Sequence, residues 1–274
     1  MSFLLLFGPG YTGSRIADAL RAEGWGVATA GRATPAPDVR AAIARASHVL
    51  SCAPPEGEGD PVLAAYGDAI AQGPTRWLGY LSSTGVYGDS HGGWVDESAP
   101  IAGRRGGRIA ADGAWLARGA CVLRLPGIYG PGRSALDRVA AGKAHRIDLP
   151  EQVFSRVHVD DIVSAACAAI ASNASGAWNI ADDLPAPQNA VIEEACALLN
   201  VPPPALLTLE AAGLSPAARA FYGENRRVAN GKAKRLLGWQ PRFPDYRAGL
   251  RALIAKTSPI STSTPPAIAS ADQR

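Results

Sequence analysis

The sequence predicts an α/β fold in which a doubly wound parallel sheet is followed by a small C-terminal lobe. Short apolar runs alternate with segments of helical periodicity from the first residues to about residue 125, and this alternation is typical of parallel βαβ units. Aromatic residues make up only 7% of the 274 residues, against 47% for all apolar types. The core must therefore consist mainly of Ala, Val, Leu and Ile, which suits such a sheet.

Five strands are expected in the first half of the chain. The run Phe3–Phe7 is apolar at every position and is followed at once by glycines, as in a strand that is buried on both faces. The other strands are expected at 27–30, 48–52, 77–81 and 120–125, with helices at 14–23, 38–46, 61–72 and 109–117. Residues 88–107 are rich in Gly, Ser and Pro and are expected to form a loop.

The second half of the chain has a looser pattern. Helices are expected at 134–141, 160–171, 186–199, 215–221 and 230–237, and a strand at 177–180. We interpret residues 1–172 mainly as the sheet domain and residues 173–256 mainly as a smaller C-terminal lobe that is interleaved with it. Residues 257–274 are rich in Ser, Thr and Pro and have little to bury, so we expect a disordered tail.

The composition argues against several classes of protein. The 27 Lys and Arg residues nearly balance the 24 Asp and Glu residues, so we expect no basic stripe for nucleic acid. No apolar run reaches the ~18 residues of a membrane span, and the N-terminal segment lacks the basic start of a signal peptide. The four cysteines form no CxxC pair, and no set of His, Cys, Asp and Glu has metal-ligand spacing. We expect a cytoplasmic protein with free thiols and no metal, membrane or nucleic-acid partner.

A glycine-rich loop directly follows the first strand and opens the first helix. Residues 8–13 read Gly8-Pro9-Gly10-Tyr11-Thr12-Gly13 and fit G-x-G-x-x-G, which in this context predicts a dinucleotide site. Gly8 allows the tight turn, Gly10 lets the backbone approach a pyrophosphate, and Gly13 allows close packing of helix and strand. The N-terminus of the helix then offers amide donors and a positive dipole end to the phosphates.

The end of the second strand indicates which dinucleotide binds. An NAD site places a carboxylate there to accept a hydrogen bond from the ribose 2′-OH, but here the chain has Arg32 and no acid before Asp38. An arginine would bind a 2′-phosphate in a bidentate manner. We therefore predict that NADP is preferred, with NAD possible, and that Arg32 binds the 2′-phosphate with Thr34 as a helper. The alternative is that Arg32 is a solvated loop residue.

Five segments, in order, extend the match beyond the glycine loop: GPGYTGSRIA (8–17), LSSTGVYGD (81–89), LRLPGIYGPGR (123–133), RVHVDDI (156–162) and WNIADDLP (178–185). With these segments the chain resembles the extended and atypical short-chain dehydrogenases/reductases, the NAD(P)-dependent epimerase/dehydratase family. The resemblance covers most of residues 1–185, and residues 226–244 also look like the C-terminal lobe of that family. It implies a Rossmann-type sheet with a small C-terminal substrate lobe.

The resemblance also implies site residues. In the family, a serine at the position of Ser83 lies beside the reacting oxygen of the substrate, and a Tyr-x-x-x-Lys pair on the next helix completes the site. Here Arg104 stands at the position of the tyrosine and Arg108 at that of the lysine, and none of the four lysines lies on this helix. Arg108 could bind the ribose or hold positive charge at the nicotinamide. Arg104 cannot shuttle a proton, but it could polarise a carbonyl or bind an anionic substrate.

Further contacts with the cofactor follow from the resemblance. Backbone at Cys52 and Ala53, next to Pro54 at the end of the third strand, is expected at the cofactor ribose. Pro126, Gly127 and Ile128 follow the fifth strand and are expected at the nicotinamide amide.

Other residues could supply the missing acid. Tyr87 follows Ser83 by four positions, and Tyr129 follows the fifth strand, so both lie near the edge of the sheet where ligands bind. Either tyrosine could donate a proton, or could be a packing aromatic with a satisfied hydroxyl. His158 with Asp160 and Asp161 could form an acid/base cluster, or else a hydrogen-bonded histidine followed by a helix cap.

These observations give two hypotheses. The first is an NADP-dependent oxidoreductase or epimerase-like enzyme that acts on a carbonyl or hydroxyl of a small polar substrate, with a nucleotide sugar as one candidate. Its catalytic residues would come from Ser83, Tyr87, Arg104 and Arg108. The alternative is a non-catalytic NADP(H)-binding protein with a redox-sensing or regulatory role. The resemblance also makes a homodimer possible, because this family often pairs helices into a dimer, but the sequence itself does not give the oligomeric state.

Overall fold

The computed structural model describes residues 2–257, apart from the side chains of residues 217, 256 and 257. The tail predicted for residues 257–274 lies outside the described residues, except for Thr257 at the end of the last helix.

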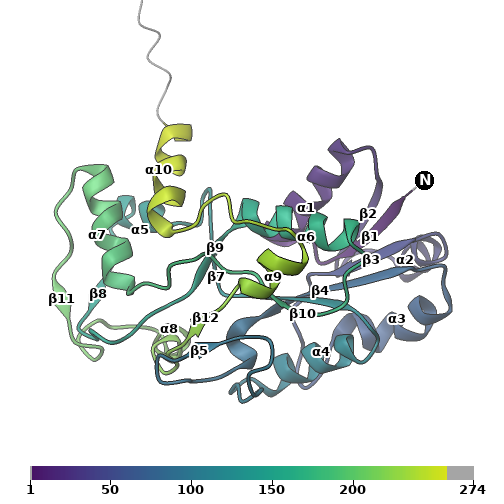
Figure 1. Ribbon diagram of the computed structural model, residues 1–274, viewed down its shortest axis with the longest axis horizontal. Coiled ribbons are helices and arrows are strands. Elements are labelled where there is room, and N and C mark those ends of the chain that lie inside the picture. Colours follow the sequence, from purple (N-terminus) through teal and green to yellow (C-terminus); the bar gives the residue numbers. More distant parts are fainter. Residues whose placement is uncertain (1, 258–274) are drawn as a thin grey trace, which may run out of the picture.

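A six-stranded parallel sheet lies at the centre of the molecule (Figure 1). Its strand order is β10-β6-β4-β3-β1-β2, and every neighbouring pair runs parallel. The strands are β1 (Phe3–Phe7), β2 (Gly26–Ala30), β3 (His48–Ser51), β4 (Trp77–Ser83), β6 (Cys121–Leu125) and β10 (Gly176–Asn179). The predicted doubly wound α/β fold of Rossmann type is confirmed.

The strand order reverses beside β1. The chain places β2 on one side of β1 and β3 on the other, so the crossover connections leave in opposite directions. Phe7 O accepts a hydrogen bond from Cys52 N at 2.9 Å, and Ala30 O accepts one from Gly8 N at 2.8 Å. These bonds hold the three strand ends together at the point where ligands bind in open parallel sheets.

Helices cover both faces of the sheet (Figure 1). On one face, α1 (Gly10–Ala22) and α6 (Val159–Ala171) pack on alternate strand residues such as Leu4 and Leu6. On the other face, α2 (Ala36–Ile43), α3 (Pro61–Gln72) and α4 (Gly106–Leu116) pack on the intervening strand residues, such as Leu5 and Phe7. Burial on both faces explains why β1 is apolar at every position.

The C-terminal lobe has its own apolar core. The helices α5 (Ala135–Ala140), α7 (Gln188–Leu199) and α10 (Tyr246–Thr257) meet around residues such as Ile192 and Leu250. Three two-stranded sheets complete the lobe and its junction: β7 (Gly127–Tyr129) with β9 (Arg156–His158), β8 (Arg146–Ile147) with β11 (Leu206–Leu207), and β5 (Trp94–Val95) with β12 (Arg227–Val228). The remaining helices are α8 (Pro216–Phe221) and α9 (Gly231–Leu236).

Several element boundaries differ from the prediction. The first helix begins at Gly10 rather than at residue 14, because the second half of the glycine loop is already helical. The fourth strand continues to Ser83, and the predicted loop 88–107 contains β5, whose partner β12 lies far away in sequence. Helix α10 was not predicted. Its apolar residues Tyr246, Leu250 and Leu253 have helical spacing, and Asp245 accepts a hydrogen bond from Ala248 N at its start.

A buried ion pair joins α4 to the sheet. Arg124 on β6 donates to both carboxylate oxygens of Asp112 on α4, at 3.1 Å and 2.8 Å, and both side chains are 3% exposed. Ser82 on β4 donates to the same carboxylate at 2.6 Å, and Arg124 also donates to the hydroxyl of Tyr87 at 3.0 Å. Such a pair needs both partners, since either charge alone would be buried without compensation.

We predict that Asp112→Asn destabilises the protein by about 3 kcal/mol, because it leaves the Arg124 guanidinium buried beside a neutral amide. Urea unfolding followed by circular dichroism measures this loss. Asp68→Asn, an exposed carboxylate on α3, is the matched control and should stay within about 0.5 kcal/mol of the wild type. Equal stability of the two variants would contradict the role given to the ion pair.

Candidate functional site

A cleft of about 1210 Å³ opens between the sheet and the C-terminal lobe. Its floor is formed by residues that follow β1, β3, β4 and β6, and its far wall by residues of α5, α7, α8 and the segment before β9. The cleft brings together most of the residues that the sequence singled out: Gly8, Gly10, Tyr11, Thr12, Gly13, Cys52, Pro54, Ser83, Arg104, Arg108, Pro126, Gly127 and Ile128. Arg32, Ala53 and Tyr87 are not among the residues that line it.

The glycine turn has the shape that a phosphate loop needs. Gly8 has φ +62°, and a Cβ there would lie 3.0 Å from backbone atoms of Ala53. A Cβ on Gly13 would lie 3.0 Å from Cys52 Sγ. Gly10 has φ +45° and a Cβ there would meet nothing within 4 Å, so its backbone faces the open cleft. A Cβ would thus be crowded at Gly8 and Gly13, and the left-handed backbone at Gly8 and Gly10 favours glycine there.

The N-terminus of α1 points into this cleft without a cap of its own. No side chain caps the helix at Pro9, and its first turn has no acidic residue. Its first amides therefore remain available to an anion. Together with the open surface at Gly10, this arrangement fits a pyrophosphate, and the residues present suit a dinucleotide.

Cys52 lies beneath this turn as a packing residue. Burial raises the pKa of its thiol above the ordinary value, so it stays protonated and is no nucleophile. The four cysteines are all free thiols.

Arg32 lies outside the cleft, on the loop after β2. Its side chain is 86% exposed and donates to Glu56 Oε1 at 2.9 Å. Thr34 accepts a hydrogen bond from Gly31 N at 2.9 Å and so shapes the loop. A 2′-phosphate would have to compete with the Glu56 carboxylate for Arg32.

Ser83 lies at the end of β4 with its hydroxyl in the cleft. Its Oγ accepts a hydrogen bond from Gly85 N at 3.1 Å, which caps the short 3₁₀ turn Thr84–Val86. Among the described residues the Ser83 hydroxyl donates to no acceptor, so its proton is available to a ligand oxygen.

Arg108 lies one turn into α4 and is half-buried in the cleft wall. It donates to the hydroxyl of Tyr80 at 3.2 Å. No carboxylate forms an ion pair with it in the described part of the chain, so its charge faces the cleft without an opposing anion.

Arg104 lines the cleft but is bound to the lobe. Its Nε donates to Glu224 Oε1 at 2.8 Å and its Nη2 to Ala220 O at 2.6 Å. Arg226 donates to the other oxygen of Glu224 at 2.6 Å. Burial acts to raise the pKa of Glu224, but the hydrogen bonds from Arg104 and Arg226 outweigh it and the net pKa is lowered. The Arg104 charge is therefore largely neutralised.

The candidate acid Tyr87 is buried and is not among the residues that line the cleft. Its side chain is 3% exposed, its hydroxyl donates to Asn179 Oδ1 at 2.7 Å, and it accepts from Arg124. These contacts favour the alternative of a packing aromatic with a satisfied hydroxyl. Tyr129 lines the cleft, but its hydroxyl points to Asp245 O at 3.4 Å.

His158 and Asp161 both accept hydrogen bonds from the backbone. His158 Nδ1 accepts from Asp160 N at 3.1 Å and caps α6. Asp161 accepts from the backbone of Arg242 and Phe243 at 2.7 Å and 3.2 Å. These contacts favour the structural alternative, with the histidine and not an aspartate as the helix cap.

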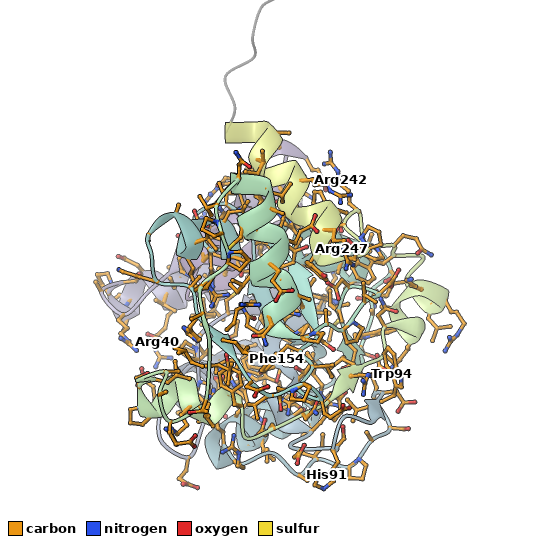
Figure 2. The ribbon with its side chains drawn as sticks, turned by 90° about the vertical axis from the view of Figure 1, so that its left-hand side faces the viewer. Arg40, His91, Trp94, Phe154, Arg242 and Arg247 are labelled. Atoms are coloured by element: carbon orange, nitrogen blue, oxygen red, sulfur yellow. The ribbon has the colours of Figure 1, made fainter. Side chains whose placement is uncertain are left out.

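The far wall of the cleft holds a group of cations that sequence reasoning missed. Arg138 on α5 and Arg156 on β9 line it, with Lys143 and His145 beside them. Figure 2 shows Phe154, two residues before Arg156, below α7 near the middle of the lobe. Over the whole cleft, eight Arg and Lys side chains face two carboxylates. The cleft therefore favours anions.

A buried carboxyl lies next to this group. Asp182 is 1% exposed, and neither of its carboxylate oxygens has a hydrogen-bond partner in the described residues. Burial raises its pKa to about 8, against a smaller lowering effect of Arg156. Asp182 in turn raises the pKa of Arg156 against the larger lowering effect of burial.

Two negative findings concern the described residues alone. They contain no group of three or more His, Cys, Asp or Glu that could hold a metal ion. None of their helices is long and apolar enough to cross a membrane.

Comparisons with solved structures show what the chain is similar to. No family model matches it. A conserved protein of unknown function from Silicibacter pomeroyi is 40% identical, with a TM-score of 0.86 over 93% of this chain and 99% of that one. The human epimerase family protein SDR39U1, solved with NADPH, is 18% identical with a TM-score of 0.75 over 92% and 99%. MoeE5 in complex with UDP-glucuronic acid and NAD is 20% identical with a TM-score of 0.76 over 93% and 98%.

A relative with an assigned activity matches part of the chain. The 3-diazoavenalumate denitrifying reductase of a Streptomyces species is 39% identical over 143 residues. The match covers 47% of this chain and 45% of the reductase, so it spans less than half of the relative's length.

We predict that the stability of the protein falls between pH 5 and pH 8 because of Asp182. A carboxyl whose pKa is raised in the folded state binds its proton more tightly there than in the unfolded chain. Its contribution is complete below the ordinary pKa of 3.8 and is lost as the pH rises through about 8. Each unit of pKa difference corresponds to ~1.4 kcal/mol, so the loss should reach a few kcal/mol.

Urea unfolding of the wild type and Asp182→Asn at pH 5, 6, 7 and 8 checks this slope. The asparagine variant should lose less stability over that range. Parallel curves for the two proteins would show that Asp182 is ionised throughout.

Proposed function

This chain belongs to the same family as the Silicibacter pomeroyi protein and has the fold of the extended and atypical short-chain dehydrogenases/reductases, and on that premise we propose that it is an NADP(H)-dependent oxidoreductase. It would act on a carbonyl or hydroxyl of a small polar substrate. The name of the Streptomyces relative supports a reductase, and the UDP-glucuronic acid bound to MoeE5 makes a nucleotide sugar one candidate substrate.

One observation supports this proposal above the others. A single cleft holds the uncapped N-terminus of α1, the free hydroxyl of Ser83 and the uncompensated charge of Arg108. A dinucleotide with its pyrophosphate at α1 would extend along the ends of β1, β3 and β4 towards Ser83.

The residues of the chain would divide the work as follows. The glycine turn and the first amides of α1 hold the pyrophosphate. The nicotinamide supplies the hydride when the cofactor is bound. Ser83 donates its hydroxyl proton in a hydrogen bond to the substrate oxygen, and Arg108 stabilises negative charge that develops on that oxygen. Cys52, Ala53 and Pro54 would contact the ribose, and Pro126, Gly127 and Ile128 the nicotinamide amide.

The preference for NADP rests on Arg32. We propose that this arginine leaves Glu56 and binds the 2′-phosphate, because a phosphate that carries about two negative charges is a stronger partner than a single exposed carboxylate.

A second function, a non-catalytic NADP(H)-binding regulator, is favoured by one observation. Arg104 occupies the position of the family's tyrosine and is held by Glu224 and Ala220 O. Arg104 therefore offers no hydroxyl in the place of the usual acid. Cofactor binding without turnover of any carbonyl substrate would support this alternative.

The proposal also places the protein in the cytoplasm as a homodimer, with a small molecule as its partner. Free cysteines agree with a reducing compartment.

We predict that NADPH binds more tightly than NADH and that Arg32→Ala removes the difference. Loss of a charge-assisted contact should weaken NADPH about tenfold or more and leave NADH unchanged. Glu56→Gln removes the competing carboxylate and should tighten the binding of NADPH but not that of NADH. Calorimetric titration of the three proteins with both cofactors measures these constants, and equal affinity of the wild type for NADPH and NADH would remove Arg32 from the cofactor site.

We predict that Ser83→Ala lowers NADPH-dependent reduction of an aldehyde or ketone substrate by about 100-fold, since it removes one donor to the developing oxyanion. The dissociation constant of NADPH should change less than twofold. Ser172→Ala, an exposed serine at the end of α6, is the control. Wild-type turnover in Ser83→Ala would remove this residue from the mechanism.

A further inference from the structure

We propose that the far end of the cleft binds the carboxylate of a planar, apolar acid, with Arg138 and Arg156 on the carboxylate and Phe154 and Tyr222 against the apolar body. The proposal rests on the proposed function, because it assigns the substrate class of the same cleft.

Neither arginine is held in a contact ion pair. In the part of the chain that the structure describes, neither of them has a carboxylate within 4.0 Å, although Asp182 lies near enough to raise the pKa of Arg156. Arg156 donates three hydrogen bonds, to Phe154 O, Ala186 O and Gln188 Oε1. All three acceptors are neutral. A guanidinium has five N–H donors, so capacity for a ligand remains.

The surroundings of Arg156 make a bound anion favourable. Its side chain is 7% exposed, and burial lowers its pKa to about 10, with Asp182 opposing this effect and Arg138 adding to it. Arg138 therefore lies close enough to repel Arg156. Arg138 also lowers the pKa of His145, although burial is the larger cause of that lowering. An anion between the two arginines would relieve this repulsion.

The walls around the arginines are apolar. The rings of Phe154 and Tyr222 meet edge to face at 5.6 Å, and Arg156 lies 5.9 Å from the Phe154 ring. Side chains from the core of the lobe also line the cleft, among them Val191, Ile192 and Leu250. A flat apolar body fits against such walls, and burial of it favours binding.

Two neutral polar groups of the cleft already take part in hydrogen bonds of the fold. Ser155 Oγ accepts from Val228 N at 2.9 Å, and Gln188 Oε1 accepts from Arg156 at 3.0 Å. A sugar would bring several hydroxyls against walls with many apolar side chains, and each unpaired group is costly. An acid with an apolar body needs partners only for its carboxylate, and this is why we assign that class rather than a nucleotide sugar.

The test is calorimetric titration of the full-length protein, with and without saturating NADPH, with three probes. They are trans-cinnamate, its neutral isostere trans-cinnamamide, and UDP-glucose. We expect cinnamate to bind at least tenfold more tightly than cinnamamide and than UDP-glucose. The Arg138 side chain makes no hydrogen bond or ion pair in the described residues, although it lines the cleft. Arg138→Gln should therefore weaken the binding of cinnamate about tenfold and leave the binding of cinnamamide unchanged.

Two further variants complete the design. Arg118→Gln makes the same chemical change at an exposed position outside the cleft and should leave all three probes unaffected. Arg156→Lys keeps the charge but loses the planar fork, and should weaken cinnamate provided that its melting temperature stays near that of the wild type. Arg138→Gln decides the question if Arg156→Lys does not fold.

The outcomes separate this proposal from the proposed function. Equal binding of cinnamate and cinnamamide, tighter binding of UDP-glucose, or an unchanged cinnamate constant in Arg138→Gln would overturn it. Absence of NADPH binding together with Arg138-dependent cinnamate binding would overturn the proposed function and leave the anion site in place.

Discussion

The close approach of the turn after β1 to the chain after β3 is the contact on which the site depends. Gly8 lies against the Ala53 backbone and Gly13 against Cys52 Sγ, so closely that a Cβ at either position would lie 3.0 Å from these atoms. Because β2 and β3 lie on opposite sides of β1, this approach occurs where the sheet changes direction and leaves a gap above the strand ends. The first amides of α1 then point into the gap without a cap, and the remainder of the cleft is built around them.

The arginines discussed above fall into two groups, those that pair with a carboxylate and those that do not. Arg124 is buried with Asp112 and serves the fold by linking α4 to β6. Arg104 and Arg226 share Glu224 and connect the lobe to the start of α4. Arg108, Arg138 and Arg156 have no such partner among the described residues and face the cleft. The pattern of 23 arginines against four lysines thus includes several planar cations in one cavity. A guanidinium matches the geometry of a carboxylate or a phosphate and can bind either through two hydrogen bonds.

The sequence allowed the sheet and the glycine turn to be predicted because both depend on local patterns. Residues Phe3–Phe7 and Pro61–Gln72 form the elements expected of them, residue for residue. The two-residue strands β5 and β12 could not be predicted, since each exists only through a partner over 130 positions away. Tyr87 was weighed as an acid because its position along the chain is right, but its partners Arg124 and Asn179 come from other strands. Arg138 and Arg156 likewise lie on separate elements, and only the folded chain places both on one wall.

The central claim is that one cleft holds a nicotinamide dinucleotide with its reactive end at Ser83 and Arg108. A crystal structure of the protein with bound NADPH tests it most directly. The account predicts the pyrophosphate on the amides of α1 at Gly10 to Gly13, and the nicotinamide ring beside Ser83 with the arginine-lined end of the cleft still open. A cofactor bound elsewhere, or with its nicotinamide turned away from Ser83, would contradict it.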